Sequence, residues 1–171
     1  MLQLHGEGLV LREWTDADLV AMSELFDEPS IDVWTPLRSP FDLAAARSYL
    51  AGARASRDSG EALQLAITLD GETPLGEVLL FGTEPGVGEL AYAVGVQHRG
   101  HSLAARAVTV AMEYGCAEMG MQEFHLNVSP QNRASQRVAE SCGFVLAGEP
   151  AFLRERKGQR IELVLWRRAA G

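Results

Sequence analysis

Residues 94–104 read VGVQHRGHSLA and connect an apolar strand pattern to a long apolar helix pattern. Gly100 permits a positive φ or the close approach of a ligand to the backbone, and Arg99 adds a positive charge. The first N–H groups of a helix lack partners within it, and the helix dipole makes that end positive, so phosphate groups bind there. The stretch therefore predicts a phosphate- or pyrophosphate-binding turn, although an ordinary strand–helix turn would use the same residues.

The sequence on either side of this turn alternates between strand and helix patterns. Alternating apolar residues, bounded by turn signals such as Asp70-Gly71, predict strands. Apolar residues at helical spacing predict helices, with Thr15 as a cap and Gly143 as a terminator. Two prolines place Asp32–Pro40 in a loop. The expected strands are Gly8–Trp14, Ala62–Leu69, Leu75–Phe81, Glu89–Val96, Glu123–Val128, Phe144–Ala147 and Ile161–Trp166. The expected helices are Thr15–Asp27, Phe41–Arg57, Leu103–Ala117 and Asn132–Cys142.

The order of these elements indicates the fold class. Three consecutive strands followed by helix, strand, helix and two strands are typical of a mixed sheet and not of a purely parallel one. We therefore expect an α+β protein with one central, mostly antiparallel sheet of about seven strands and about four helices. No repeat, linker or low-complexity segment interrupts the chain, so residues 1–171 are expected to form a single domain.

The composition excludes several classes of protein. The 171 residues include 15 Lys+Arg and 23 Asp+Glu, which gives a formal net charge of −8, and 47% are hydrophobic. The hydrophobic share is typical of a soluble globular domain, and the acidic balance argues against nucleic-acid binding because the field of the protein repels phosphates. Two cysteines are too few for a disulfide framework. Without a recognisable signal peptide or membrane-spanning segment, we expect a cytoplasmic protein with no membrane partner.

Two other motifs compete for the region around the turn. Gly100-His101-Ser102 followed by Leu103-Ala104 reads G-x-S-x-A, close to the nucleophile elbow of α/β-hydrolases. The triad also needs an acid and then a histidine downstream, and His125 is the one histidine after this motif. Gly86-Val87-Gly88 lacks the third glycine of a dinucleotide fingerprint and leads into a strand. A small serine hydrolase remains a weaker alternative, and no motif predicts a metal site.

A second informative stretch, residues 128–137, reads VSPQNRASQR. Asn132 or Gln131 can cap the helix that follows, and Ser135 lies one turn inside it. Serine is a poor helix former, so a serine here is either a solvated side chain or a polar group facing a ligand at the helix end.

The two stretches together resemble the GNAT N-acetyltransferases, and within them the subgroup of the ribosomal-protein N-acetyltransferases RimJ and RimL. The acetyl-CoA loop of that family reads Q/R-x-x-G-x-G/A, and Gln97–Ser102 matches it with serine in the last place. The N-x-x-S and G-F pattern of the subgroup is present as Asn132, Ser135 and Gly143-Phe144. The resemblance covers nearly the whole chain, beginning with GLVLREWTDADLVAM.

The resemblance implies a GNAT fold whose sheet is splayed between the fourth and fifth strands, with the pantetheine arm of acetyl-CoA in the gap. Backbone groups of Val94 and Val96 would bond the arm as an added strand does. An amine would attack the thioester directly in a ternary complex, and Ser135 would protonate the departing thiolate. The cofactor-binding residues implied are Val94, Gly95, Val96, Gln97, Arg99, Gly100, His101, Ser102, Leu103, Ala104 and Asn132.

The general base is less determined by the sequence. Glu89, at the start of the fourth strand, is the first candidate, and His125 on the fifth strand is the second because the intrinsic pKa of histidine lies near neutrality. Either could instead be a structural residue. The subgroup sometimes has a glutamate in the late hairpin; here the position is Arg154, and Glu155 is one place away.

The acceptor remains open between a protein N-terminal α-amine and a small-molecule amine, and the net charge favours a cationic acceptor of either kind. The choice of acceptor is expected to depend on the loops Glu28–Pro40 and Phe152–Gln159. A homodimer is compatible with the resemblance. The alternative from another class is an acyl-CoA-binding sensor domain without turnover.

Overall fold

The computed structural model describes all 171 residues and contains nine strands, five α-helices and two short 3₁₀-helices. The strands are β1 (Gln3–Gly6), β2 (Leu9–Glu13), β3 (Ala62–Thr68), β4 (Gly76–Glu84), β5 (Val87–Val94), β6 (Glu123–Val128), β7 (Val145–Leu146), β8 (Phe152–Arg156) and β9 (Gln159–Ala169). The helices are η1 (Asp16–Asp18), α1 (Leu19–Phe26), α2 (Pro29–Trp34), α3 (Leu43–Ser59), η2 (Val96–His98), α4 (Leu103–Met119) and α5 (Arg133–Ser141).

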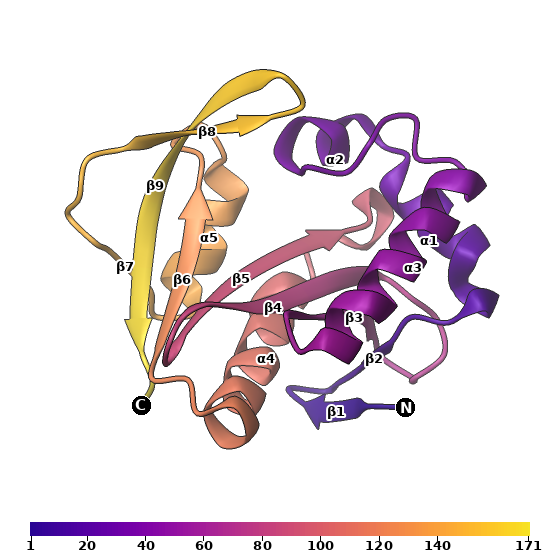
Figure 1. Ribbon diagram of the computed structural model, residues 1–171, viewed down its shortest axis with the longest axis horizontal. Coiled ribbons are helices and arrows are strands. Elements are labelled where there is room, and N and C mark those ends of the chain that lie inside the picture. The colour runs from indigo at the N-terminus through magenta and orange to yellow at the C-terminus, as the bar shows by residue number, and fades with distance from the viewer.

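The strands form a sheet in which β5 and β6 are the one parallel pair (Figure 1). The order is β1-β2-β3-β4-β5-β6-β9-β7, and β8 forms a hairpin with β9. The pairing of β5 with β6 covers only Val87–Glu89 against Glu123–His125. Beyond these residues the two strands diverge, so the sheet is split between β5 and β6 (Figure 1).

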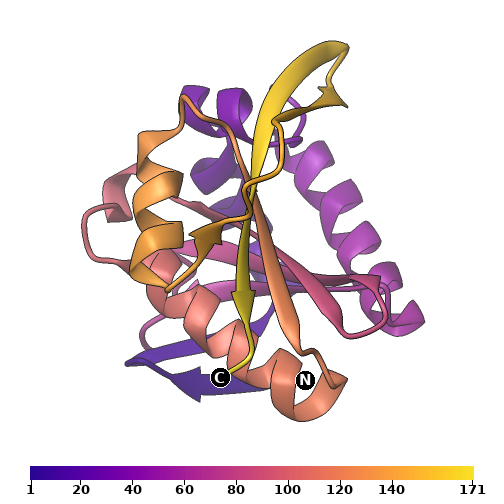
Figure 2. The ribbon, with the colours of Figure 1, turned by 90° about the vertical axis from the view of Figure 1, so that its left-hand side faces the viewer.

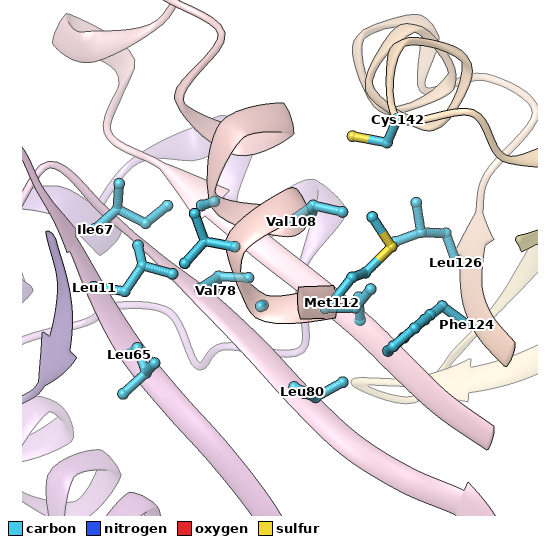
Figure 3. Packing of buried hydrophobic residues seen from close by; sticks show 14 of the residues in the cluster. Leu11, Leu65, Ile67, Val78, Leu80, Val108, Met112, Phe124, Leu126 and Cys142 are labelled. Carbon is cyan, nitrogen blue, oxygen red and sulfur yellow. The ribbon is translucent and has the colours of Figure 1, made fainter. Parts of the chain in front are cut away.

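Helices cover the two faces of the sheet, which lies between α4 and α5 on one side and α3 on the other (Figure 2). The larger hydrophobic cluster lies between the sheet and α4, where Val108 and Met112 pack near Val78, Leu80 and residues of β6 (Figure 3). A second cluster, which includes Phe26 and Phe41, lies beneath α1 and α3. None of the helices is both long and apolar enough to cross a bilayer.

The α+β class and the mostly antiparallel sheet are confirmed, but the predicted number of strands was too low. The patterns missed β1 and β8, because β1 has only four residues and β8 is almost entirely exposed, so neither shows a clear apolar alternation. The split consequently lies between the fifth and sixth strands and not between the fourth and fifth.

Two local predictions were also wrong. The region around Asp32–Pro40 is not all loop, because α2 runs from Pro29 to Trp34 with proline at a position where its missing N–H costs nothing. The carboxylate of Glu28 caps that helix by accepting from Ser30 N at 3.0 Å and Ile31 N at 3.2 Å. The strand predicted as Glu89–Val96 ends at Val94, because Val96–His98 forms a 3₁₀-turn.

A buried carboxylate, Glu77 on β4, faces the second hydrophobic cluster with 1% of its surface exposed. Trp14 Nε1 donates to it at 2.8 Å and the Tyr49 hydroxyl at 2.5 Å. Burial raises the pKa of Glu77 to about 7, although both hydrogen bonds oppose that shift. The carboxyl group therefore takes up a proton on folding over the mildly acidic range.

This proton makes stability pH-dependent. Because the folded-state pKa of Glu77 lies above the ordinary value of 4.5, its contribution is fully present at low pH and is lost as pH rises through about 7. Between pH 5 and pH 8 the free energy of unfolding should fall by about 2 kcal/mol more in the wild type than in Glu77→Gln. Urea denaturation at both pH values measures this difference. Glu84→Gln, an exposed substitution on the same strand, is the control, and equal pH dependence in all three proteins would contradict the prediction.

Candidate active site

A cleft of about 300 Å³ lies at the split between β5 and β6. Its walls are the end of β5, the beginnings of α4 and α5, and helix α2. Ten of its 18 lining residues are hydrophobic, and the polar ones concentrate in the loop before α4, at the start of α5 and on α2. Mostly apolar clefts with a few convergent polar groups are typical small-molecule sites.

The loop before α4 presents a row of unused backbone donors. No N–H group from Arg99 to Ala105 donates to another backbone or side-chain atom of the protein. Gly100 has a φ of 84° and Ser102 a φ of 56°, so the loop reaches this shape through two left-handed residues. The serine at position 102 thus occupies a conformation that favours glycine. Free donors at the positive end of a 17-residue helix form a site for phosphate groups.

Arg99 connects this loop to β5 and α2. Its Nε donates to the Val94 carbonyl at 3.1 Å, and its Nη2 donates to the Ser30 hydroxyl at 2.7 Å. Glu28, whose pKa is lowered mainly by the hydrogen bond from the Ser30 hydroxyl, lies 3.5 Å from the same guanidinium. The guanidinium therefore fixes α2 beside the cleft.

The backbone of Val94 faces the split in the sheet. Gly95 N donates to the Leu75 carbonyl beside β4, and successive residues of a strand direct their backbone groups to opposite neighbours. The N–H of Val94 consequently points away from β4 and toward the cleft, while the Val94 carbonyl is occupied by Arg99.

Two hydroxyl groups lie in the cleft near the start of α5. Asn132 caps this helix by accepting from Ser135 N at 3.1 Å, which fixes the first turn. The Ser135 hydroxyl lines the cleft beside the Tyr92 hydroxyl. Tyr92 donates to the Ser135 carbonyl at 3.4 Å, and burial raises the pKa of Tyr92 to about 12. Both groups therefore carry a proton at neutral pH.

The structure brings together most, but not all, of the residues proposed from the sequence. Gly95 is buried against Leu25, and Val96, Gln97 and His101 are exposed outside the cleft, because β5 ends before them and η2 turns the chain. Sequence reasoning missed Tyr92, His98 and the α2 residues; no pattern pointed to α2, which was expected to be loop. The proposed residues that line the cleft are Val94, Arg99, Gly100, Ser102, Leu103, Ala104, Asn132 and Ser135.

The two candidate bases lie outside the lining of the cleft. Glu89 and His125 are register partners in the last pair before β5 and β6 diverge. Glu89 is 8% exposed, and Arg154 Nη1 lies 3.3 Å from its Oε1. His125 Nε2 lies 2.5 Å from Glu123 Oε1. The residues next to Glu89 and His125 along their strands belong to the hydrophobic cluster beneath α4. Successive side chains of a strand point to opposite faces, so Glu89 and His125 lie on the face of the sheet away from α4.

A family model described as an acetyltransferase (GNAT) domain matches residues 8–145 of the chain. The protein belongs to the GNAT acetyltransferase family. The predicted GNAT fold is therefore confirmed, with the sheet split that the resemblance implied. An uncharacterized N-acetyltransferase, p20 of Bacillus licheniformis, is 23% identical over 97% of this chain and 95% of its own length.

Solved structures share the fold of this GNAT protein at low sequence identity. RimJ of Mycobacterium smegmatis, in complex with CoA-disulfide, superposes with a TM-score of 0.84 at 21% identity, covering 99% of this chain and 86% of its own. A GNAT acetyltransferase of Bacillus anthracis has a TM-score of 0.84 at 15% identity, covering 98% of each chain. The neighbours thus include a member of the subgroup that the sequence resembles.

Proposed function

We propose that this GNAT protein transfers an acetyl group from acetyl-CoA to a primary amine in a ternary complex. The observation that carries the proposal is the row of free N–H groups at the start of α4, directly beside an apolar cleft in the split sheet. Pyrophosphate fits the first feature, and an extended pantetheine arm fits the second. That the related RimJ structure holds a CoA derivative supports the choice of ligand.

In this arrangement the backbone amides from Arg99 to Ala104 bind the pyrophosphate, and the arm runs past Val94 toward Ser135. The Val94 N–H points into the split, where it can bond the arm or the thioester oxygen on which negative charge develops. Asn132 contacts the arm from α5 while holding the first turn of that helix.

The transfer itself needs two proton movements. The amine nitrogen forms a bond to the acetyl carbon, and the bond from that carbon to sulfur breaks. Ser135, whose hydroxyl lines the cleft, gives its proton to the departing thiolate and regains a proton from solvent, so that the amine proton is the one lost overall. Glu89 is the proposed acceptor of the amine proton, with His125 as the second candidate, because both lie at the opening of the split on the face away from α4.

Acetyl-CoA binding and turnover can be tested separately. A ligand present at about 100 times its dissociation constant should raise the free energy of unfolding by about 2.7 kcal/mol. Thermal unfolding with acetyl-CoA measures this, and thiol release is then followed with N-terminal peptides and small amines. No stabilisation by acetyl-CoA would exclude the proposal. Stabilisation without thiol release from any amine would favour the acyl-CoA sensor.

A further inference from the structure

The acceptor side of the sheet is the face that carries Glu89, Ala91, His125 and Arg154. Ala91 is exposed although β5 is a central strand, so no helix covers the sheet at this point. In the view of Figure 1, α1 and α3 lie to the right of the split between β5 and β6, and the β8–β9 hairpin and α2 lie at its upper end. Arg154 of the hairpin contacts Glu89 at the split, so an acceptor bound at Glu89 on this face lies next to the hairpin.

The hairpin is fixed over this face by contacts with α2. Lys157 Nζ, at its tip, lies 2.6 Å from Asp32 Oδ1, and Arg156 Nη1 donates to the Trp34 carbonyl at 2.8 Å. Trp34 also lines the cleft. The positions of the hairpin side chains are therefore set before any acceptor arrives.

Two guanidinium groups of the hairpin lie side by side on the acceptor face. Arg154 and Arg156 are two residues apart on β8, so they share one face of the strand, and Arg154 contacts Glu89 on β5. Arg156 has no carboxylate within ion-pair distance. Its pKa is lowered first by burial and then by the charge of Arg154, as expected for a desolvated cation beside another.

The charges of this region do not follow the net charge of the chain. On the face of β8 that carries Arg154 and Arg156, and at the hairpin tip, three cations face two carboxylates: Arg154, Arg156 and Lys157 against Glu89 and Asp32. The other charged residues of the hairpin, Glu155, Arg160 and Glu162, lie on its opposite face. One positive charge remains unmatched, at Arg156, in a protein whose formal net charge is −8. The local field next to the split thus favours an anionic group and not the cationic acceptor expected from the composition.

We propose that the acceptor is a peptide N terminus with an acidic residue in its first few positions, whose carboxylate binds Arg156 and Arg154. This inference rests on the proposed acetyltransferase function and names the acceptor class of the same site. Glu89, held by Arg154, lies where it can receive the α-ammonium group. The exposed side chains of Trp34 and Phe152 provide apolar contacts for a chain longer than a single amino acid.

The test compares kcat/KM for three peptides that differ only at positions two and three. Both positions are glutamate in the first peptide, glutamine in the second and lysine in the third. The glutamate peptide should exceed the glutamine peptide by about tenfold, and the lysine peptide should be the poorest. Arg156→Gln should remove most of this preference, and Arg156→Glu should reverse it. Arg160→Gln, an exposed substitution on the same hairpin that lies opposite Glu155, should leave it unchanged.

Acetyl-CoA-dependent thermal stabilisation of each variant shows that it is folded and binds cofactor. The inference is overturned if the wild type uses the three peptides equally or prefers lysine, or if Arg156→Gln keeps the wild-type ratio. Acetylation of free glutamate with none of the peptides would overturn the peptide assignment. Acetylation of no amine at all would overturn the proposed function itself, and the inference with it.

Discussion

Replacing Ser135 by alanine should lower kcat by about a hundredfold or more, while the dissociation constant of acetyl-CoA changes by less than about twofold. The hydroxyl lines the cleft, and its removal leaves the cap of α5 intact, because Asn132 accepts from the Ser135 backbone N–H and not from the side chain. The proposed role of the Ser135 hydroxyl is confined to the step in which the thiolate leaves. Single-turnover thiol release measures the rate of that step, and calorimetric titration measures the affinity.

Ser141→Ala is the matched control, because Ser141 is an exposed serine at the other end of the same helix, where its hydroxyl donates to the Val138 carbonyl. Tyr92→Phe separates the two hydroxyl groups of the cleft, since the Tyr92 proton is also available at neutral pH. An unchanged kcat in Ser135→Ala together with a large loss in Tyr92→Phe would transfer the role of proton donor to Tyr92.

Replacing Gly100 by valine should raise the dissociation constant of acetyl-CoA by more than about a hundredfold, while the protein still folds. Gly100 has a φ of 84°, which a β-branched residue adopts only with strain, and a Cβ placed there meets no protein atom within 4 Å. The loop is therefore free to change its backbone angles, which turns the row of N–H groups away from the pyrophosphate. Losing two such charge-assisted bonds, each worth about 1.5 kcal/mol or more, gives the expected effect.

The control for backbone strain is Gly120→Val, at the other end of α4. Gly120 also has a positive φ, 65°, and open space around its Cβ position. Both variants should lose similar stability in urea denaturation, and only Gly100→Val should lose cofactor binding. Retained binding in Gly100→Val would remove this loop from the cofactor site.

The parts of the fold that could be predicted are those fixed by local chemistry. The apolar run of α4, the Asp70-Gly71 turn and the glycine that ends α5 each have a local cause, and all are present. The same is true of Asn132 as a helix cap and of Gly100 as a left-handed residue at the phosphate loop. These features need no knowledge of distant parts of the chain.

The contacts that shape the acceptor side could not be predicted, because they join residues far apart in sequence. Arg154 meets Glu89 across 65 positions, and Lys157 meets Asp32 across 125. At the late-hairpin position where the subgroup sometimes has a glutamate, this chain has Arg154. In the structure Arg154 contacts the carboxylate of Glu89 on β5. Short exposed elements such as α2 also carry no periodic signal, so its part in the cleft wall was missed.

The central claim, direct transfer from acetyl-CoA to an amine in one ternary complex, is tested most directly by initial-rate kinetics. Thiol release is measured while acetyl-CoA is varied at several fixed concentrations of an acidic N-terminal peptide. We predict double-reciprocal lines that intersect and no acetylated enzyme by mass spectrometry when the acceptor is omitted. Parallel lines, with an acetyl group found on the enzyme, would show a ping-pong mechanism with a covalent intermediate and would contradict the account.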